Sequence, residues 1–186
     1  PVITLGRRAP ESDILVTQAA LDAVGVQVRR TTRGGEATYH GPGQIVGYII
    51  ANLYNHQRQL KRFVASIEEL FVRLLDRYYG ITATTSEKHR GVWVGDEKIT
   101  AIGIAVTENI TMHGFAFNVS PDLSHFRFIV PCGIRDKGVT SLAKLLGTTP
   151  DLAVVKAQVA EMFCTVFGYS PRWTETTRGN SSGRRR

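Results

Sequence analysis

Cysteine is scarce in this chain, which has two, Cys132 and Cys164, among 186 residues. Two cysteines cannot supply the disulfide framework on which small secreted domains depend, so the composition fits a reducing compartment. No cysteines and histidines cluster at zinc-ligand spacing, and the five histidines are scattered, so we expect no metal site. No apolar run approaches the length that spans a bilayer, and we expect no membrane association.

Two further features are missing at the N-terminus. The chain has no initiator Met and no recognisable signal peptide, and it opens on a strand-like stretch at residues 1–5. We therefore expect that an upstream segment has been removed or is not shown in this sequence. We also expect the protein in the cytoplasm, or in the mitochondrial matrix if its source is eukaryotic.

The net charge of +7 is unevenly distributed along the chain. Residues 172–186 contribute +4 through five arginines and one glutamate, and residues 176–186 have the composition of a disordered, basic tail. Residues 1–175 keep a weak positive excess, which fits either plain solubility or attraction toward acidic partners. No basic stripe with interleaved aromatic residues is present, so we expect no nucleic-acid binding.

Hydrophobic periodicity divides residues 1–175 into strands and helices. The predicted helices cover residues 13–24, 60–79, 139–146 and 150–167, and the predicted strands cover residues 2–5, 26–31, 45–51, 81–85, 91–94, 98–106 and 110–118. Residues 45–51 are nearly all apolar, which is typical of a buried central strand. The pattern predicts a single α/β (α+β) domain with a mixed sheet flanked by helices.

A glycine-rich segment at residues 33–44 is the first candidate site. It reads Arg-Gly-Gly-Glu-Ala-Thr-Tyr-His-Gly-Pro-Gly-Gln, so polar side chains are interleaved with glycines that let backbone approach a ligand. Clusters of glycine and proline are mostly turns. The residues alone therefore leave this segment open between a ligand loop and a connection between strands.

A cysteine in a Pro-Cys-Gly turn, Cys132, follows the apolar residues 126–130 and is the candidate nucleophile. A cysteine nucleophile requires a base or a positively charged neighbour. His40 and His113 are available partners. A lysine can also serve when burial lowers its pKa, and Lys98 stands where a turn enters an apolar strand. Cys164 lies among apolar residues of a predicted helix, and we expect it in the core.

Small residues mark two successive predicted strands, at Ala101-Ile102-Gly103 and at Gly114-Phe115-Ala116. Small side chains beside strand backbones leave room for a chain-like ligand, and they equally allow close packing of one strand on another. The two interpretations stay open on these residues alone.

Four blocks, in the same order, resemble the signature of the lipoyl(octanoyl)transferase family. They are the glycine-rich segment at residues 33–44, Gly95-Asp96-Glu97-Lys98-Ile99-Thr100-Ala101-Ile102-Gly103-Ile104 (one residue looser than the family pattern), His113-Gly114-Phe115-Ala116-Phe117-Asn118, and Pro131-Cys132-Gly133. The resemblance implies an α/β domain similar to the catalytic domain of biotin and lipoate protein ligases. It also implies transfer of an octanoyl (or lipoyl) group from acyl carrier protein to a specific lysine of lipoyl domains, in lipoate biosynthesis and protein lipoylation.

The resemblance also implies roles for individual residues. The family residue that matches Cys132 accepts the acyl group as a thioester, and the one that matches Lys98 is its acid/base partner. The implied substrate-binding residues are Arg33, Gly34, Gly35, Glu36, Ala37, Thr38, Tyr39, His40, Ala101, Ile102, Gly103, Gly114, Phe115 and Ala116. No cofactor is implied, because the phosphopantetheine belongs to the acyl carrier protein. The implied partners are acyl carrier protein, the lipoyl domains of 2-oxoacid dehydrogenase complexes and the glycine cleavage H protein, and we expect a monomer.

Two alternatives remain. An ATP-dependent lipoate or biotin protein ligase has the same type of fold, but it activates a free acid as an acyl-adenylate and has no need of Cys132. A catalytically inert module that docks acyl carrier protein or lipoyl domains would not need Cys132 or Lys98. The family usually has an additional segment ahead of residues 1–5, so the N-terminal edge of the fold is unaccounted for.

Overall fold

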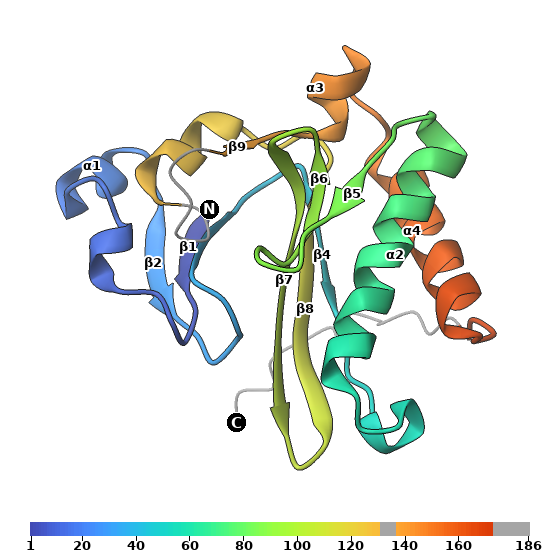
Figure 1. Ribbon diagram of the computed structural model, residues 1–186. Coiled ribbons are helices and arrows are strands. Elements are labelled where there is room, and N and C mark those ends of the chain that lie inside the picture. Colours follow the sequence, from blue (N-terminus) through green and yellow to red (C-terminus); the bar gives the residue numbers. More distant parts are fainter. Residues whose placement is uncertain (131–136, 173–186) are drawn as a thin grey trace, which may run out of the picture.

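The computed structural model describes residues 1–130 and 137–172, and its largest element is a six-stranded sheet (Figure 1). The strands run in the order β4-β8-β7-β6-β5, and β9 lies beside β7. Their bounds are β4 Gln44–Tyr48, β5 Thr84–Thr85, β6 Val92–Val94, β7 Glu97–Thr107, β8 Ile110–Asn118 and β9 Gly138–Val139. The pairs along this path are antiparallel, whereas β9 is parallel to β7.

A second sheet of three strands has the order β2-β1-β3, with β1 at Val2–Leu5, β2 at Gln27–Arg30 and β3 at Ala37–His40. β1 is parallel to β2 and antiparallel to β3. Parallel neighbours need a crossover connection, and it contains the 3-10 turn η1 (Glu11–Asp13) and the helix α1 (Gln18–Ala23). The mixed pairing confirms the predicted α/β fold class.

Two helices, α2 (Leu60–Tyr79) and α4 (Leu152–Phe167), cover one side of the large sheet, and the small sheet lies on the other side (Figure 1). α2 carries its buried residues at helical spacing and ends at Gly80, whose φ of 63° is the left-handed conformation that closes many helices. Phe71 of α2 packs against Phe115 and Phe117 of β8, with ring centroids 4.7 and 5.0 Å away. This packing forms the main core.

A smaller core lies under the three-stranded sheet. It joins β1, α1 and β3 to the 3-10 segment η3 (Leu123–Phe128). Tyr39 of β3 is 1% exposed and its hydroxyl lies 2.8 Å from His125 Nδ1. The core consists of Ile3, Leu5, Ala9, Leu21, Val26, Ala37, Tyr39, Phe126, Phe128 and Ile129.

The structure corrects the prediction of a buried central strand at residues 45–51. β4 ends at Tyr48 and lies at the edge of the sheet as described, paired with β8. Its alternate residues Val46 and Tyr48 are 43% and 72% exposed. The apolar run was misleading because one face of β4 joins the core while the other borders the pocket described below.

Three other boundaries differ from the predictions. Ile14 is extended and bridges Ile129, and Leu15 N donates to Phe128 O, so the helix predicted at 13–24 is reduced to α1. Residues 139–146 hold the end of β9 and the helix α3 (Leu142–Leu146), which Ser141 caps. Within the glycine-rich segment, β3 forms because its backbone pairs with β1.

Three further predictions concern the two cysteines and the C-terminal tail. Cys132 and the predicted tail at 176–186 lie outside the described residues. Cys164 is half-buried and borders a groove between β4 and α4, so its assignment to the core is wrong.

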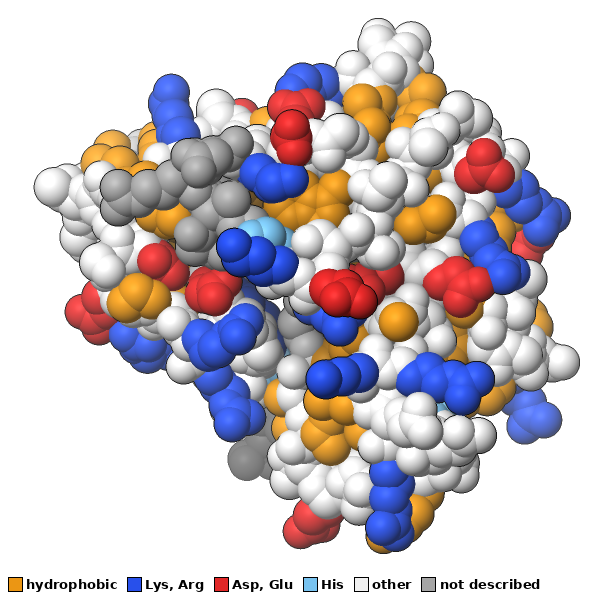
Figure 2. Space-filling model, in the orientation of Figure 1, with side chains coloured by type: hydrophobic (Ala, Val, Ile, Leu, Met, Phe, Trp, Pro, Cys, Tyr) orange, Lys and Arg blue, Asp and Glu red, His pale blue; other side chains and the backbone are white. Residues whose placement is uncertain are grey.

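No helix within residues 1–130 and 137–172 has the length and apolar character to cross a membrane. On the face drawn in Figure 2, Lys and Arg side chains are interspersed with Asp and Glu.

Candidate active site between the two sheets

The floor of the main pocket is made of small residues on β7 and β8. Ala101 pairs with Ala116 and Gly103 pairs with Gly114, so all four lie on the same face of the sheet. Between them, Ile102 and Phe115 point to the opposite face, where Phe115 meets Phe71 of α2. The alternation of small and large residues therefore gives the sheet one packed face and one open face.

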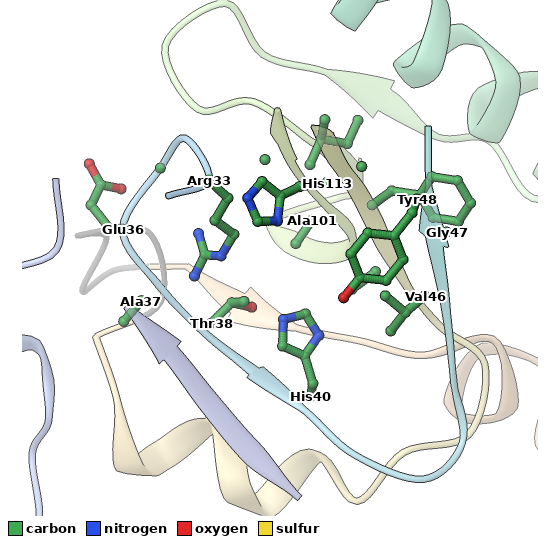
Figure 3. A pocket seen from close by; sticks show the side chains of 16 residues that line it. Arg33, Glu36, Ala37, Thr38, His40, Val46, Gly47, Tyr48, Ala101 and His113 are labelled. Atoms are coloured by element: carbon green, nitrogen blue, oxygen red, sulfur yellow. The ribbon is translucent and has the colours of Figure 1, made fainter. Parts of the chain in front are cut away.

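The walls of the pocket come from both sheets (Figure 3). Val46 and Tyr48 of β4 stand on one side, and Arg33, Thr38 and His40 stand on the other with their side chains turned inward. The pocket has a volume of about 560 Å³, part of it open to solvent. It is lined by Arg33, Gly35, Glu36, Ala37, Thr38, His40, Val46, Gly47, Tyr48, Ala101, Ile102, Gly103, His113, Gly114, Phe115 and Ala116.

A β-bulge turns Lys98 toward this face. Val92 pairs with Thr100 and Trp93 pairs with Lys98, so Ile99 is an extra residue in β7. In a regular strand, residues 98 and 101 would point to opposite faces. The bulge restores them to one face, and Lys98 and Ala101 line a small space together with Thr38 and Asn118. Thr38, Ala101 and Ala116 border both this space and the main pocket, so the two spaces adjoin each other.

Lys98 is held in a defined position although only 5% of it is exposed. Its Nζ donates to Arg90 O over 3.0 Å and lies 4.7 Å from the centre of the Trp93 ring. Arg90 is placed in turn by the Glu68 carboxylate, which lies 3.0 Å from Arg90 Nη1 and accepts from Gly91 N over 2.9 Å. A buried amine needs such partners because an unpaired charge is costly away from water.

Thr4 of β1 links two side chains of the glycine-rich segment. Its hydroxyl accepts from Arg33 Nε and Nη2 over 3.1 and 2.9 Å, and it lies 3.2 Å from His40 Nε2. His40 Nδ1 is buried and has no hydrogen-bond partner among the described residues. Burial and the nearby Arg33 charge lower the pKa of His40 from 6.5 to about 4. His40 is therefore a neutral imidazole at neutral pH.

The lowered pKa of His40 predicts a loss of stability in mild acid. The folded protein resists protonation of His40, whereas the unfolded chain accepts a proton below pH 6.5. Its contribution to stability is therefore constant above pH 6.5 and falls as the pH drops toward 4. In urea titrations, the free energy of unfolding should fall between pH 7 and pH 5 by about 2 kcal/mol more in the wild type than in His40→Gln. A His40 resonance that titrates near 6.5 in NMR spectra would contradict this assignment.

A polar network ties the glycine-rich segment to the strand that carries Lys98. Gln44 Nε2 donates to Asn118 Oδ1 over 2.9 Å and to Tyr39 O over 3.1 Å. Asn118 Nδ2 donates to Thr140 O, and Thr140 N donates to Lys98 O, each over 3.0 Å. Buried polar groups that satisfy one another in this way hold the surrounding backbone in place.

Two glycine contacts bring the sheets close enough to form the pocket. A Cβ atom on Gly103 would lie 2.8 Å from Gly34 O, and one on Gly34 would lie 2.9 Å from Ile104 O. Gly34 N also donates to Ile104 O over 3.2 Å. A side chain at either position would push the glycine-rich segment away from β7.

Most of the predicted substrate-binding residues lie together. Twelve of the fourteen border the main pocket; Gly34 instead packs on Ile104, and Tyr39 points into the smaller core. Glu36 borders the pocket, but its side chain points away (Figure 3). The prediction did not include Val46, Gly47, Tyr48 and His113, which also border it. The alternation along residues 44–48 was the available signal for Val46 and Tyr48, whereas no local pattern marks Thr4 or Glu68.

The arrangement of these sheets is that of the lipoate and biotin protein ligases. The superposition on a lipoate protein ligase of Thermoplasma acidophilum with bound lipoic acid has a TM-score of 0.74 at 15% identity, over 95% of this chain and 73% of that one. A lipoate-protein ligase A bound with ATP gives 0.72 at 18% identity, over 95% and 73%. The biotin protein ligase of Aquifex aeolicus gives 0.60 at 16% identity, over 90% and 70%.

Sequence comparison narrows this class to one family. Residues 1–164 match the lipoyl protein ligase A/B catalytic domain. The octanoyltransferase of Alkaliphilus metalliredigens is 52% identical over 169 residues, which are 91% of this chain and 78% of that protein. The octanoyltransferase of Caldicellulosiruptor saccharolyticus is 55% identical over 169 residues, or 90% and 72%. The chain belongs to the lipoyl(octanoyl)transferase family.

Proposed function

We propose that this protein transfers an octanoyl group from acyl carrier protein to a lysine of lipoyl domains through a thioester on Cys132. The observation that carries the proposal is that the main pocket, with its floor of small residues, adjoins the space that the buried Lys98 lines. Such a slot accepts an extended apolar chain and presents one end of it to an acid/base group. The octanoyltransferases among the relatives of this chain support the same reaction.

The reaction proceeds in two balanced steps. In the first, the Cys132 sulfur attacks the thioester carbonyl, the bond from the carbonyl carbon to the pantetheine sulfur breaks, and free acyl carrier protein leaves as a thiol. In the second, the amine of the target lysine attacks the Cys132 thioester, an amide forms and the Cys132 thiol is restored. Thioester exchange is nearly balanced and amide formation is downhill, so no ATP is required. Two successive half-reactions predict ping-pong kinetics.

Lys98 serves as the acid/base partner in this scheme. Its Nζ takes the proton from the Cys132 thiol and returns it to the departing pantetheine sulfur, and in the second step it accepts the proton that the amine loses. The bulge in β7 and the bond to Arg90 O support this role, because they hold the amine on the pocket face of the sheet. A general acid/base group has to be positioned before the substrate arrives.

The proposed donor and acceptors are those that the family resemblance implies. The donor is octanoyl-acyl carrier protein, whose phosphopantetheine supplies the thioester, and the acceptors are lipoyl domains of 2-oxoacid dehydrogenase complexes and the glycine cleavage H protein. One structural neighbour of this chain is the bi-partite lipoate protein ligase of Thermoplasma acidophilum, which acts in an archaeal lipoylation system with its E2 lipoyl domain. We propose that this protein acts as a monomer without a bound cofactor.

The test is intact-protein mass spectrometry after mixing the protein with octanoyl-acyl carrier protein and no ATP. We expect a mass gain of one octanoyl group on the wild type and on Cys164→Ser, and none on Cys132→Ser. Cys164 borders the groove between β4 and α4 and does not line the main pocket, which makes it a matched control. When a lipoyl domain is then added, the octanoyl group should leave the protein, and the lipoyl domain should gain the mass of one octanoyl group.

Two results would reject the proposed transferase activity. No adduct on folded wild-type protein, with or without an acceptor, would remove the covalent mechanism. Lipoylation that requires ATP and free acid would favour the ligase activity of structural neighbours such as the ATP-bound lipoate-protein ligase A.

A further inference from the structure

The pocket has two chemically different ends along the β7–β8 ladder. Lys98 lies at one end, beyond the Ala101–Ala116 pair. The Gly103–Gly114 pair follows, and then the pair of Ile104 with His113. From Ala101 to Ile104 the strand rises about 10 Å, the length scale of an extended medium-chain acyl group. If the proposed function holds, the carbonyl lies at the Lys98 end, because an acid/base group must reach the reacting atoms. The methyl end of the acyl chain then points toward His113.

His113 is fixed at that end by an unusual backbone. Its φ of 64° lies in the left-handed region, which few non-glycine residues adopt and in which histidine is enriched. Ile49 N donates to His113 O over 2.8 Å, which anchors this conformation to the segment after β4. The ring Nε2 lies 3.0 Å from Thr32 Oγ1, just ahead of the glycine-rich segment. The side chain therefore bridges the two sheets at the outer end of the pocket.

Tyr48 stands beside His113 on the other wall. The two ring centroids are 6.4 Å apart at an interplanar angle of 37°. Although 72% of Tyr48 is exposed, its ring is turned into the space between the sheets (Figure 3). Gly103 and Gly114 beneath carry no side chains, so the bulk at this end comes from the two rings and from the Gly34 backbone that packs on Gly103.

We propose that Tyr48 and His113 form the distal end of the acyl site and set the length of acyl chain that the enzyme accepts. This inference rests on the proposed acyl transfer. An acyl chain of fitting length ends against the two rings, whereas a longer chain has to displace them. The proposal makes both residues determinants of specificity, with no part in the proton transfers.

The test is a competition for transfer among acyl carrier proteins loaded with hexanoyl to tetradecanoyl groups. Tyr48→Ala and His113→Gly open the distal end, and glycine keeps the positive φ at position 113. We expect each to raise kcat/KM for dodecanoyl relative to octanoyl by about tenfold or more, because a few methylenes in an apolar site discriminate by this order. Tyr48→Trp, which adds bulk, should shift the preference toward hexanoyl.

Ile50→Ala is the matched control. Ile50 is an apolar residue just past β4 that is 76% exposed and does not border the main pocket, and its substitution should leave the ratio unchanged. Unchanged ratios in Tyr48→Ala, Tyr48→Trp and His113→Gly, with octanoyl still transferred by the wild type, would overturn the inference alone. Absence of any transfer by the wild type would reject the proposed function and this inference with it.

Discussion

Replacing Lys98 with methionine should slow transfer of the octanoyl group by a factor of about 10² to 10⁴, the usual contribution of one general acid/base group. Methionine fills the volume of the lysine stem and adapts to irregular cores. It removes the amine that donates to Arg90 O and lies over Trp93. Single-turnover formation of the acyl-enzyme, followed by mass spectrometry, measures the step that depends on Lys98.

Two further variants separate proton transfer from charge and from folding. Lys98→Arg keeps a positive charge, but an arginine does not release its proton in proteins, so it should be nearly as slow as Lys98→Met. Lys144→Met removes an exposed lysine that pairs with Glu97 at 2.7 Å, and its rate should match the wild type. A Lys98→Met enzyme that stays within about threefold of the wild-type rate would exclude Lys98 as the acid/base group.

Replacing Glu68 with alanine should produce the largest loss of stability among the residues around the site. Glu68 is 2% exposed, and its carboxylate is bound by Arg90 Nη1 and by the buried Gly91 N. Without it, Gly91 N loses its acceptor and the Arg90 guanidinium loses its counter-charge. The Arg90 side chain is 40% exposed, so water can replace part of what it loses. We therefore expect the free energy of unfolding to fall by about 3 kcal/mol, which is at the lower end of the range for breaking a buried ion pair.

The same substitution should also slow acyl transfer, because Arg90 O is the acceptor that orients Lys98. Thermal unfolding should show a fall in Tm of roughly 6 to 12 °C for a domain of this size. Glu68→Gln keeps an acceptor for Gly91 N, so its Tm should fall by about half as much. The adjacent exposed residue provides the control, because Glu69→Ala breaks only a surface pair with Arg73 and should cost less than about 1 kcal/mol. Equal Tm values for Glu68→Ala and Glu69→Ala would contradict the role given to Glu68.

Local sequence patterns were sufficient for the elements whose partners are near in the chain. The helix predicted at residues 60–79 matches α2, since its apolar stripe and the closing Gly80 act within the helix itself. The strands predicted at residues 98–106 and 110–118 match β7 and β8 to within one residue, because the alternation that indicates a strand is a local pattern. Four ordered motifs indicated the family, which the comparisons confirm.

The placement of Lys98 depended on how the strands pair. A bulge at Ile99 decides which face Lys98 occupies, and a change of one residue in register reverses every side chain of a strand. That register is set within the β6–β7 pair, whose strands are neighbours in the chain, but no residue pattern marks the position of the bulge. Thr4 and Glu68, which hold His40, Arg33 and Arg90, lie 36, 29 and 22 residues from these partners along the chain. The motifs of residues 33–134 therefore indicate the family, whereas strand pairing and the packing of the two sheets and α2 decide where each group points, because side-chain direction follows from backbone pairing.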